Sequence, residues 1–157
     1  MARAAERQGP SDDEKAEKYQ EFLQEEIGKP MRYVFHDVDA SDDEKLEQLR
    51  DEHGFEAMGR WWLLVERMAG RKWHRFETRR AHGWERLARA LEFDGDDAVE
   101  RCKEFIGWLL ELELLHRDSF EECGYVRSER IERNAYQMAE GTAGRMLGAW
   151  IKQQKSS

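Results

Sequence analysis

Residues 31–68 read MRYVFHDVDASDDEKLEQLRDEHGFEAMGRWWLLVERM, and this stretch contains the strongest fold signals of the chain. Its first residues, Met31–Phe35, are apolar or aromatic enough to predict a short strand. A polar HDVDA turn follows, and Ser41 with Glu44 forms the capping box of an acidic helix. Gly54 ends that helix, and the residues after it carry apolar side chains at helical spacing. The stretch therefore predicts a strand, a turn and two helices, the second of them central to the core.

An amphipathic helix precedes this stretch. Ser11 and Glu14 form a capping box that begins it, and the Gly28-Lys29-Pro30 step ends it. One face of this helix is an apolar stripe of Tyr19, Phe22, Leu23 and Ile27. Such a stripe needs to be covered, either by the chain's own core or by the same stripe of a second subunit. We favour the second alternative, a homodimer formed through these four residues.

Residues 84–127 contain the order of elements that is typical of a winged helix-turn-helix. A short amphipathic helix at residues 84–93 is followed by a DGDD turn and a longer helix at residues 97–113. Two apolar runs, residues 114–117 and 124–127, then flank the polar segment DSFEEC and predict a β-hairpin, the wing. The predicted fold is therefore mainly α, a winged helix-turn-helix with a short β-hairpin wing and extra N- and C-terminal helices.

The domain boundaries follow from the same patterns. We expect an N-terminal helical arm at residues 1–30, the winged-helix domain at residues 31–128 and a C-terminal helix at residues 129–157. The last helix contains three glycines, each of which costs up to about 1 kcal/mol relative to alanine. They are Gly141, Gly144 and Gly148. They predict interruptions, so the end of this helix is expected to fray or to dock on a partner.

Composition places the chain among globular intracellular proteins. With 157 residues, 39% of them hydrophobic, it can bury one core. Cys102 and Cys123 do not form a disulfide framework, which favours a reducing, cytoplasmic location. No apolar run approaches the roughly 20 residues that a membrane-spanning helix needs, and the first residues lack the apolar segment of a signal peptide.

The net charge of −8 is distributed in blocks of alternating sign. Residues 60–89 hold nine Lys or Arg and three Asp or Glu, a local charge of +6, with aromatic residues between them. Such a basic block is typical of a polyanion-binding surface, although a solvated helix face gives the same pattern. The candidate DNA-binding residues are Arg71, Lys72, Trp73, Arg75, Arg79 and Arg80, with Arg127 and Arg130 near the expected wing. Trp73 is the aromatic residue most expected to be exposed and to stack on a base.

The helix expected at residues 97–113 is the one that a winged helix would lay in the major groove. Its exposed positions are Asp97, Glu100, Arg101, Glu104 and Glu111, one positive and four negative. Base readout relies mainly on Arg, Lys, Asn and Gln donors, of which this face offers almost none. We therefore expect any DNA contact to lie on the basic block and the wing, and to be weak and mainly electrostatic.

The sequence offers no catalytic constellation. His36 and Asp37 form an HD pair, but no further histidine precedes them as a phosphohydrolase metal site requires, so a structural turn is the simpler interpretation. His74 and His82 lack a third ligand for zinc. Neither a nucleophile paired with a base nor a Gly-rich phosphate loop is present. We expect a protein that is not an enzyme and that binds no metal or cofactor.

The order of motifs resembles the N-terminal winged-helix domain of phage replisome organisers, the DnaD-type replication-initiation proteins of phages and mobile elements. The shared pattern is a strand ending in an HD-x-N-A turn, an acidic helix, a Gly stop and an apolar helix. The matching positions are Phe35, His36, Asp37, Ala40, Leu46, Leu49, Gly54, Glu56, Gly59, Trp62 and Glu66. The later runs FIGWLLELELLHRD and YVRSERIERN are similar to that family's helix, wing and final helix. Asp39 replaces the usual Asn, and His53 the usual Tyr.

This resemblance implies a replication-initiation accessory protein that contacts DNA and replication proteins such as a helicase or its loader. The activities of the family's second helical region are not carried over, because the resemblance covers only about residues 31–150. The alternative is a winged-helix protein-protein interaction module with no direct nucleic-acid role, which would use the acidic N-terminal helix and the wing.

Overall fold

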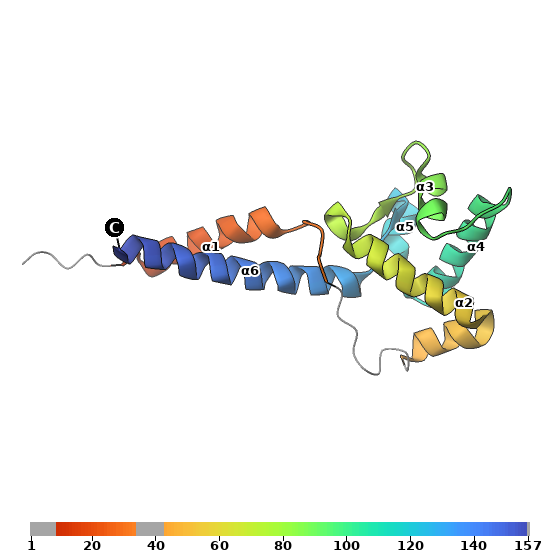
Figure 1. Cartoon of the computed structure of the whole chain (residues 1–157), viewed down its shortest axis with the longest axis horizontal. Helices are drawn as coiled ribbons and strands as arrows, with labels where there is room; N and C mark the ends of the chain where they lie inside the picture. Colours follow the sequence, from red (N-terminus) through yellow and green to blue (C-terminus); the bar gives the residue numbers. More distant parts are fainter. Residues whose placement is uncertain (1–8, 34–42, 157) are drawn as a thin grey trace, which may run out of the picture. The chain divides into compact units, whose positions relative to one another are not determined.

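The computed structural model describes residues 9–33 and 43–156, which form a mainly helical fold with a small antiparallel sheet (Figure 1). The helices are α1 (Asp12–Glu26), α2 (Glu44–Ala69), α3 (Gly83–Ala90), α4 (Ala98–Glu111), α5 (Arg117–Cys123) and α6 (Glu129–Ser156). The 3-10 helix η2 covers Lys72–His74, and the strands are β1 (Phe76–Glu77) and β2 (Tyr125–Val126). The chain divides into an arm unit, Met1–Gly28 with Asn134–Ser157, and a core unit, Lys29–Arg133.

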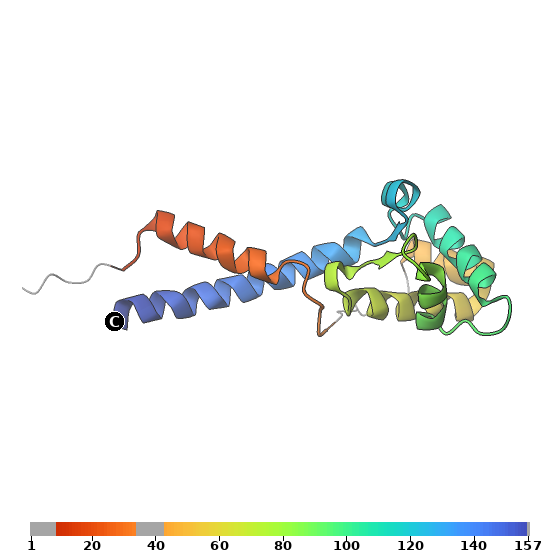
Figure 2. The same ribbon diagram turned by 90° about the horizontal axis from the view of Figure 1, so that it is seen from above.

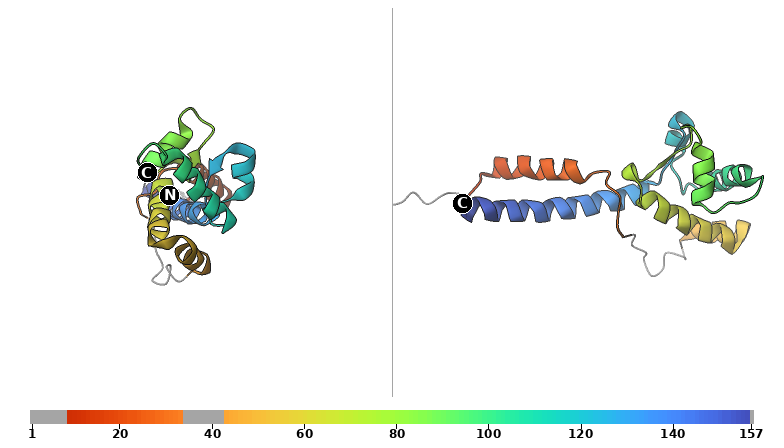
Figure 3. Two further views of the ribbon diagram at one scale, coloured as in Figure 1. Left: turned by 90° about the vertical axis from the view of Figure 1, so that its right-hand side faces the viewer. Right: turned by 45° about the horizontal axis from the view of Figure 1, so that its top comes forward.

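In the arm unit, α1 lies alongside the C-terminal part of α6 (Figure 2, Figure 3). The predicted capping box begins α1, where the Ser11 hydroxyl accepts a hydrogen bond from the Glu14 amide at 3.2 Å. Leu23 packs against Ala139 and Ala143, whereas the Lys18 ammonium, five residues earlier in α1, lies 5.8 Å from the ring centroid of Trp150. Residue numbers therefore run in opposite directions, and the two helices are antiparallel.

The apolar stripe predicted on α1 faces α6 of the same chain. Leu23 is buried together with Ala139 and Ala143, and Tyr19, Phe22 and Ile27 pack around these three. The small alanine side chains let α1 approach α6 closely, which is what buries Leu23. Leu23 is thus covered without a second subunit, and a homodimer through the stripe stays a prediction.

The predicted interruptions of α6 are wrong. The helix continues without a break through Gly141, Gly144 and Gly148 to Ser156. Packing of α1 on the alanine face of α6 offsets the glycines' weak helix propensity, because most helical stability in proteins comes from tertiary contact. Despite its length, neither α6 nor any other described helix is apolar enough to span a membrane.

The first residues of the predicted strand, residues 31–33, do not form a strand. The Met31 amide donates instead to the Ala69 carbonyl at the end of α2, at 2.8 Å. Residues 34–42 lie outside the described residues, and with them the HD turn and Ser41 of the predicted capping box. Asp43 is the N-cap of α2, and its carboxylate accepts from the Lys45 amide at 3.0 Å.

Gly54 breaks α2 into two segments, as the sequence predicted. Its φ of 88° and ψ of 174° lie far from helical values, and Figure 1 shows the change of direction at this point. The second segment carries the apolar stripe, in which Trp61, Leu64, Val65 and Met68 are buried. The prediction that this segment is central to the core is confirmed.

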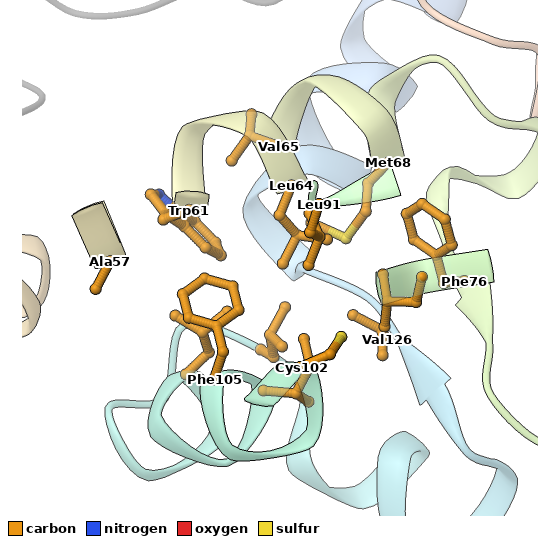
Figure 4. Close-up of a cluster of buried hydrophobic side chains, with 14 of the residues drawn as sticks. Ala57, Trp61, Leu64, Val65, Met68, Phe76, Leu91, Cys102, Phe105 and Val126 are labelled. Atoms are coloured by element: carbon orange, nitrogen blue, oxygen red, sulfur yellow. The ribbon is translucent and has the colours of Figure 1, made fainter. Parts of the chain in front are cut away.

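The hydrophobic side chains buried in the core unit lie between α2, α3, α4 and the two strands (Figure 4). From α2 come Ala57, Trp61, Leu64, Val65 and Met68, from the α3 region Leu87 and Leu91, from α4 Cys102, Phe105, Ile106 and Leu109, and from the strands Phe76 and Val126. Phe105 is 1% exposed and packs edge-to-face on Trp108 and tilted on Phe93, with ring centroids 6.3 and 6.0 Å away. The predicted helices at residues 84–93 and 97–113 thus both contribute to one core.

The predicted wing hairpin is wrong. The segment expected as its turn forms α5, and β2 pairs with β1, Phe76 opposite Val126, instead of with residues 114–117. A hydrogen bond from the His116 amide to the Arg127 carbonyl, at 3.0 Å, joins the two ends of this segment. The pairing is extended by the Thr78 amide and hydroxyl, which donate to the Gly124 carbonyl at 2.9 and 2.7 Å. A helix therefore occupies the place where a hairpin was expected.

Candidate nucleic-acid interface

A tight turn after α2 begins the basic block. Trp73 and His74, with φ values of 62° and 56°, adopt two consecutive left-handed conformations in η2. His74 is buried, and its Nε2 lies 2.8 Å from the Lys29 carbonyl oxygen. Trp73, in contrast, is 47% exposed. The turn directs the imidazole inward and the indole outward.

Two arginines next to this turn lie on aromatic rings. The Arg71 guanidinium carbon is 4.2 Å from the ring centroid of Phe76, and its Nε donates to the Arg75 carbonyl at 3.0 Å. The Arg75 guanidinium carbon is 4.0 Å from the ring centroid of Tyr125. A planar guanidinium over a ring is attracted to the ring's quadrupole, so both cations are held in defined orientations.

These side chains surround one hollow on the surface of the core unit, with a volume of about 540 Å³. Its lining consists of Arg71, Lys72, Trp73, Arg75, Glu77 and Arg80. Glu77 joins two of the cations: one carboxylate oxygen is 3.4 Å from Arg75 and the other 2.7 Å from Arg80. With four cations and one anion, the hollow has a local charge of +3. We call it the basic hollow.

Three of the eight predicted residues do not line the basic hollow. Arg79 donates from its guanidinium to the Glu122 and Glu121 carbonyls, at 2.5 and 2.7 Å, and so caps the C-terminal end of α5. Arg127 forms a two-pronged ion pair with Glu132, with N–O distances of 2.7 Å. Arg130 lines a different hollow, beside Lys45 and His116. The structure therefore gathers Arg71, Lys72, Trp73, Arg75 and Arg80, and places the other three elsewhere.

The outer face of α4 is acidic, as the sequence indicated. Glu100, Glu104 and Glu111 are exposed, while Arg101 is half-buried, its guanidinium 5.4 Å from the Phe93 ring centroid. Sequence reasoning did not include Lys103, which is exposed and lies 3.8 Å from Glu100. Addition of this one cation leaves the face negative, so phosphates would still be repelled there.

Sequence reasoning also missed Glu77 and Tyr125. The ion pair between Glu77 and Arg80 has a local signal, since the two are three residues apart. Tyr125 lies opposite Glu77 in the β1–β2 register, and this proximity of residues far apart in the chain has no local signal.

Comparison with known proteins yields one match. The family described as Lin1244/Lin1753-like, N-terminal, matches residues 33–131. Neither the curated proteins nor the solved structures contain a significant match. The matched range includes α2 to α5 and the entire lining of the basic hollow.

Proposed function

The chain belongs to the Lin1244/Lin1753-like family, a phage-type family, and from this premise we propose that it is a phage or mobile-element replication-initiation accessory protein with weak, mainly electrostatic DNA binding. The observation that supports this proposal is the basic hollow, where four cations and an exposed indole come together in an otherwise acidic chain. Helicases or their loaders are the partners that such a role implies.

Within this proposal the core unit is a variant of the winged helix. In it α3 and α4 form the helix-turn-helix, β2 returns to pair with β1, and α5 stands in place of the wing hairpin. The acidic outer face of α4 excludes the usual use of the second helix in the major groove. DNA would instead contact the basic hollow, chiefly through its phosphates.

The first test is charge reversal in the basic hollow. Replacing Arg71, Lys72 and Arg75 together by Glu converts a charge of +3 into −3 and should abolish binding of a short fluorescent duplex in an anisotropy titration at low salt. The net charge of +3 in the basic hollow corresponds to about three phosphate contacts, and each contact releases about one counterion. For the unaltered protein, a plot of the logarithm of affinity against the logarithm of salt concentration should therefore have a slope of about −3.

Two further variants complete this test. Lys72 and Arg80 make no cation-ring contact in the described structure, so Lys72→Glu with Arg80→Glu reverses charge and keeps the rings under Arg71 and Arg75 covered. It should reduce affinity at least tenfold. Arg101→Glu, on α4, is the matched control and should change little. Full affinity in both hollow variants, or binding that does not depend on salt, would show that DNA contacts another surface.

The alternative function is a protein-protein interaction module with no direct nucleic-acid role. The observation that favours it is the acidic outer face of α1, where Glu17, Glu21 and Glu25 are exposed at helical spacing. Such a face repels phosphates and is complementary to a basic surface of a protein partner. Absence of any DNA binding at low salt would favour this alternative over the first proposal.

We also propose that the protein is a homodimer through the arm unit, using Tyr19, Phe22 and Ile27 around the buried Leu23. Deleting residues 1–29 should then convert the dimer into a monomer, as measured by light scattering. Leu23→Asp in the full chain should do the same, because a buried carboxylate would separate α1 from α6. If the intact and truncated proteins are both monomers and truncation only lowers the melting temperature, α1 merely covers its own α6.

A further inference from the structure

The backbone at Trp73 is held in an unfavourable conformation. Left-handed values cost an L-residue roughly 1–2 kcal/mol, and here two consecutive residues, Trp73 and His74, adopt them. The conformation persists because the buried His74 ring is bonded to Lys29 and because the Arg71 side chain bonds the Arg75 carbonyl. A strained turn that is fixed from both sides, and that leaves a large aromatic ring in solvent, is a feature of binding sites.

We infer that Trp73 is a stacking platform for an unpaired base, so that the basic hollow binds single-stranded DNA in preference to duplex. This inference rests on the proposed function, since it concerns the same site. Inside a duplex, both faces of a base are covered by the neighbouring base pairs, so an indole on a protein surface can stack only on a terminal pair. In a single strand each base offers a free face, and stacking on an aromatic ring accepts any base.

The surroundings of the indole fit this ligand. Arg71 and Arg75 each lie over a ring, Phe76 or Tyr125. Arg71 uses its Nε–H on the Arg75 carbonyl, and Arg75 uses one terminal nitrogen on Glu77. A guanidinium has five N–H donors, so each arginine has others that can donate to phosphate oxygens. Lys72 precedes Trp73 directly and adds a mobile cation. The basic hollow therefore presents one aromatic face with cations on its border, which matches the alternation of base and phosphate along a strand.

The test compares three fluorescent probes in anisotropy titrations: a short thymidine oligonucleotide, the same oligonucleotide with abasic sites, and a duplex of equal length. The abasic strand keeps the phosphates and loses the bases. With the unaltered protein, the thymidine strand should bind roughly tenfold more tightly than the abasic strand at one salt concentration. Equal affinities for these two strands would overturn the inference and leave electrostatic DNA binding intact.

The variants separate the ring from the charge. Trp73→Lys adds a cation and removes the indole, so it should weaken binding of the thymidine strand roughly tenfold while binding of the abasic strand stays equal or improves. Trp73→Phe keeps a ring and should restore most of the loss. Phe55→Lys, which alters an exposed aromatic outside the basic hollow, is the matched control and should not weaken binding of either strand.

The outcomes distinguish the two proposals. If Trp73→Lys keeps the full preference of the unaltered protein for the thymidine strand over the abasic strand, stacking on Trp73 is refuted and the proposed function stands. If the unaltered protein binds none of the three probes at low salt, both proposals are refuted. Thermal melting of each variant shows whether the fold is retained. Lys and Phe, like Trp, are not branched at Cβ, so the backbone cost at position 73 stays the same in these variants.

Discussion

Replacing Gly83 by Ala should destabilise the core unit by on the order of 3 kcal/mol, because the added Cβ would collide with backbone. A Cβ at this position would lie 2.5 Å from the Glu77 carbonyl oxygen and 2.6 Å from that of Thr78. Neither atom can move freely, since β1 is paired with β2 and the Thr78 amide is bonded to Gly124 at 2.9 Å. Chemical denaturation followed by circular dichroism measures the loss.

Gly59→Ala is the control for this prediction. Gly59 lies inside α2 and is exposed, and a Cβ added to it would meet no heavy atom within 4 Å beyond its own helix. Alanine there should stabilise the protein by about 0.5–1 kcal/mol, since only the entropic cost of glycine in a helix is removed. Equal effects of the two substitutions would contradict the close approach of α3 to β1. The collision would displace β1, and with it Glu77, which pairs with Arg75 and Arg80. Gly83→Ala should therefore also weaken DNA binding at the basic hollow.

The helices could be predicted because their signals are local. The Ser11 cap, the break at Gly54 and the N-terminal boundary of α4 at Asp97 are each determined by residues within a turn or two. The failure of the wing prediction has a local cause as well. The Nδ1 atom of His116 accepts from the Ser119 amide at 3.2 Å and begins α5, and Gly124, with a φ of 72°, ends it. Histidine is an uncommon cap, but the glycine was a helix signal that the hairpin interpretation overlooked.

The candidate site could be predicted as a block of charge and not as a set of free cations. Arg79 belongs to the same basic block as Arg71, yet it caps α5, and Arg127 pairs with Glu132. The partners of Arg79 are more than 40 residues away in the chain, which no local spacing reports, whereas Glu132 is only five residues from Arg127. The exposure of Trp73 was predicted from its basic neighbours, but the left-handed turn that produces it has no glycine or asparagine to announce it.

The two cysteines should differ in reactivity by at least a thousandfold. Burial raises the pKa of Cys102 to about 12, against the smaller opposing effect of the Arg60 charge. Only the thiolate reacts, so at pH 8 on the order of 10⁻⁴ of Cys102 is in the reactive form, and the side chain is fully enclosed in the core (Figure 4). Cys123 is exposed at the end of α5. A chromogenic disulfide reagent should therefore titrate one thiol per native chain at pH 8 and two in denaturant.

The variant Cys123→Ser should leave no reactive thiol in the native protein, while Cys102→Ala should leave the fast reaction unchanged.

The raised pKa of Cys102 also determines how the stability of the protein depends on pH. Folding favours the protonated thiol of Cys102, so this contribution to stability is complete below the usual thiol pKa of 9.0 and is lost as pH rises from there toward 12. Cys102→Ala should flatten that alkaline decline, although it also leaves a small cavity in the hydrophobic core that lowers stability at every pH. Rapid labelling of Cys102 in the native state would mean that α4 opens away from α2 far more readily than its buried face indicates.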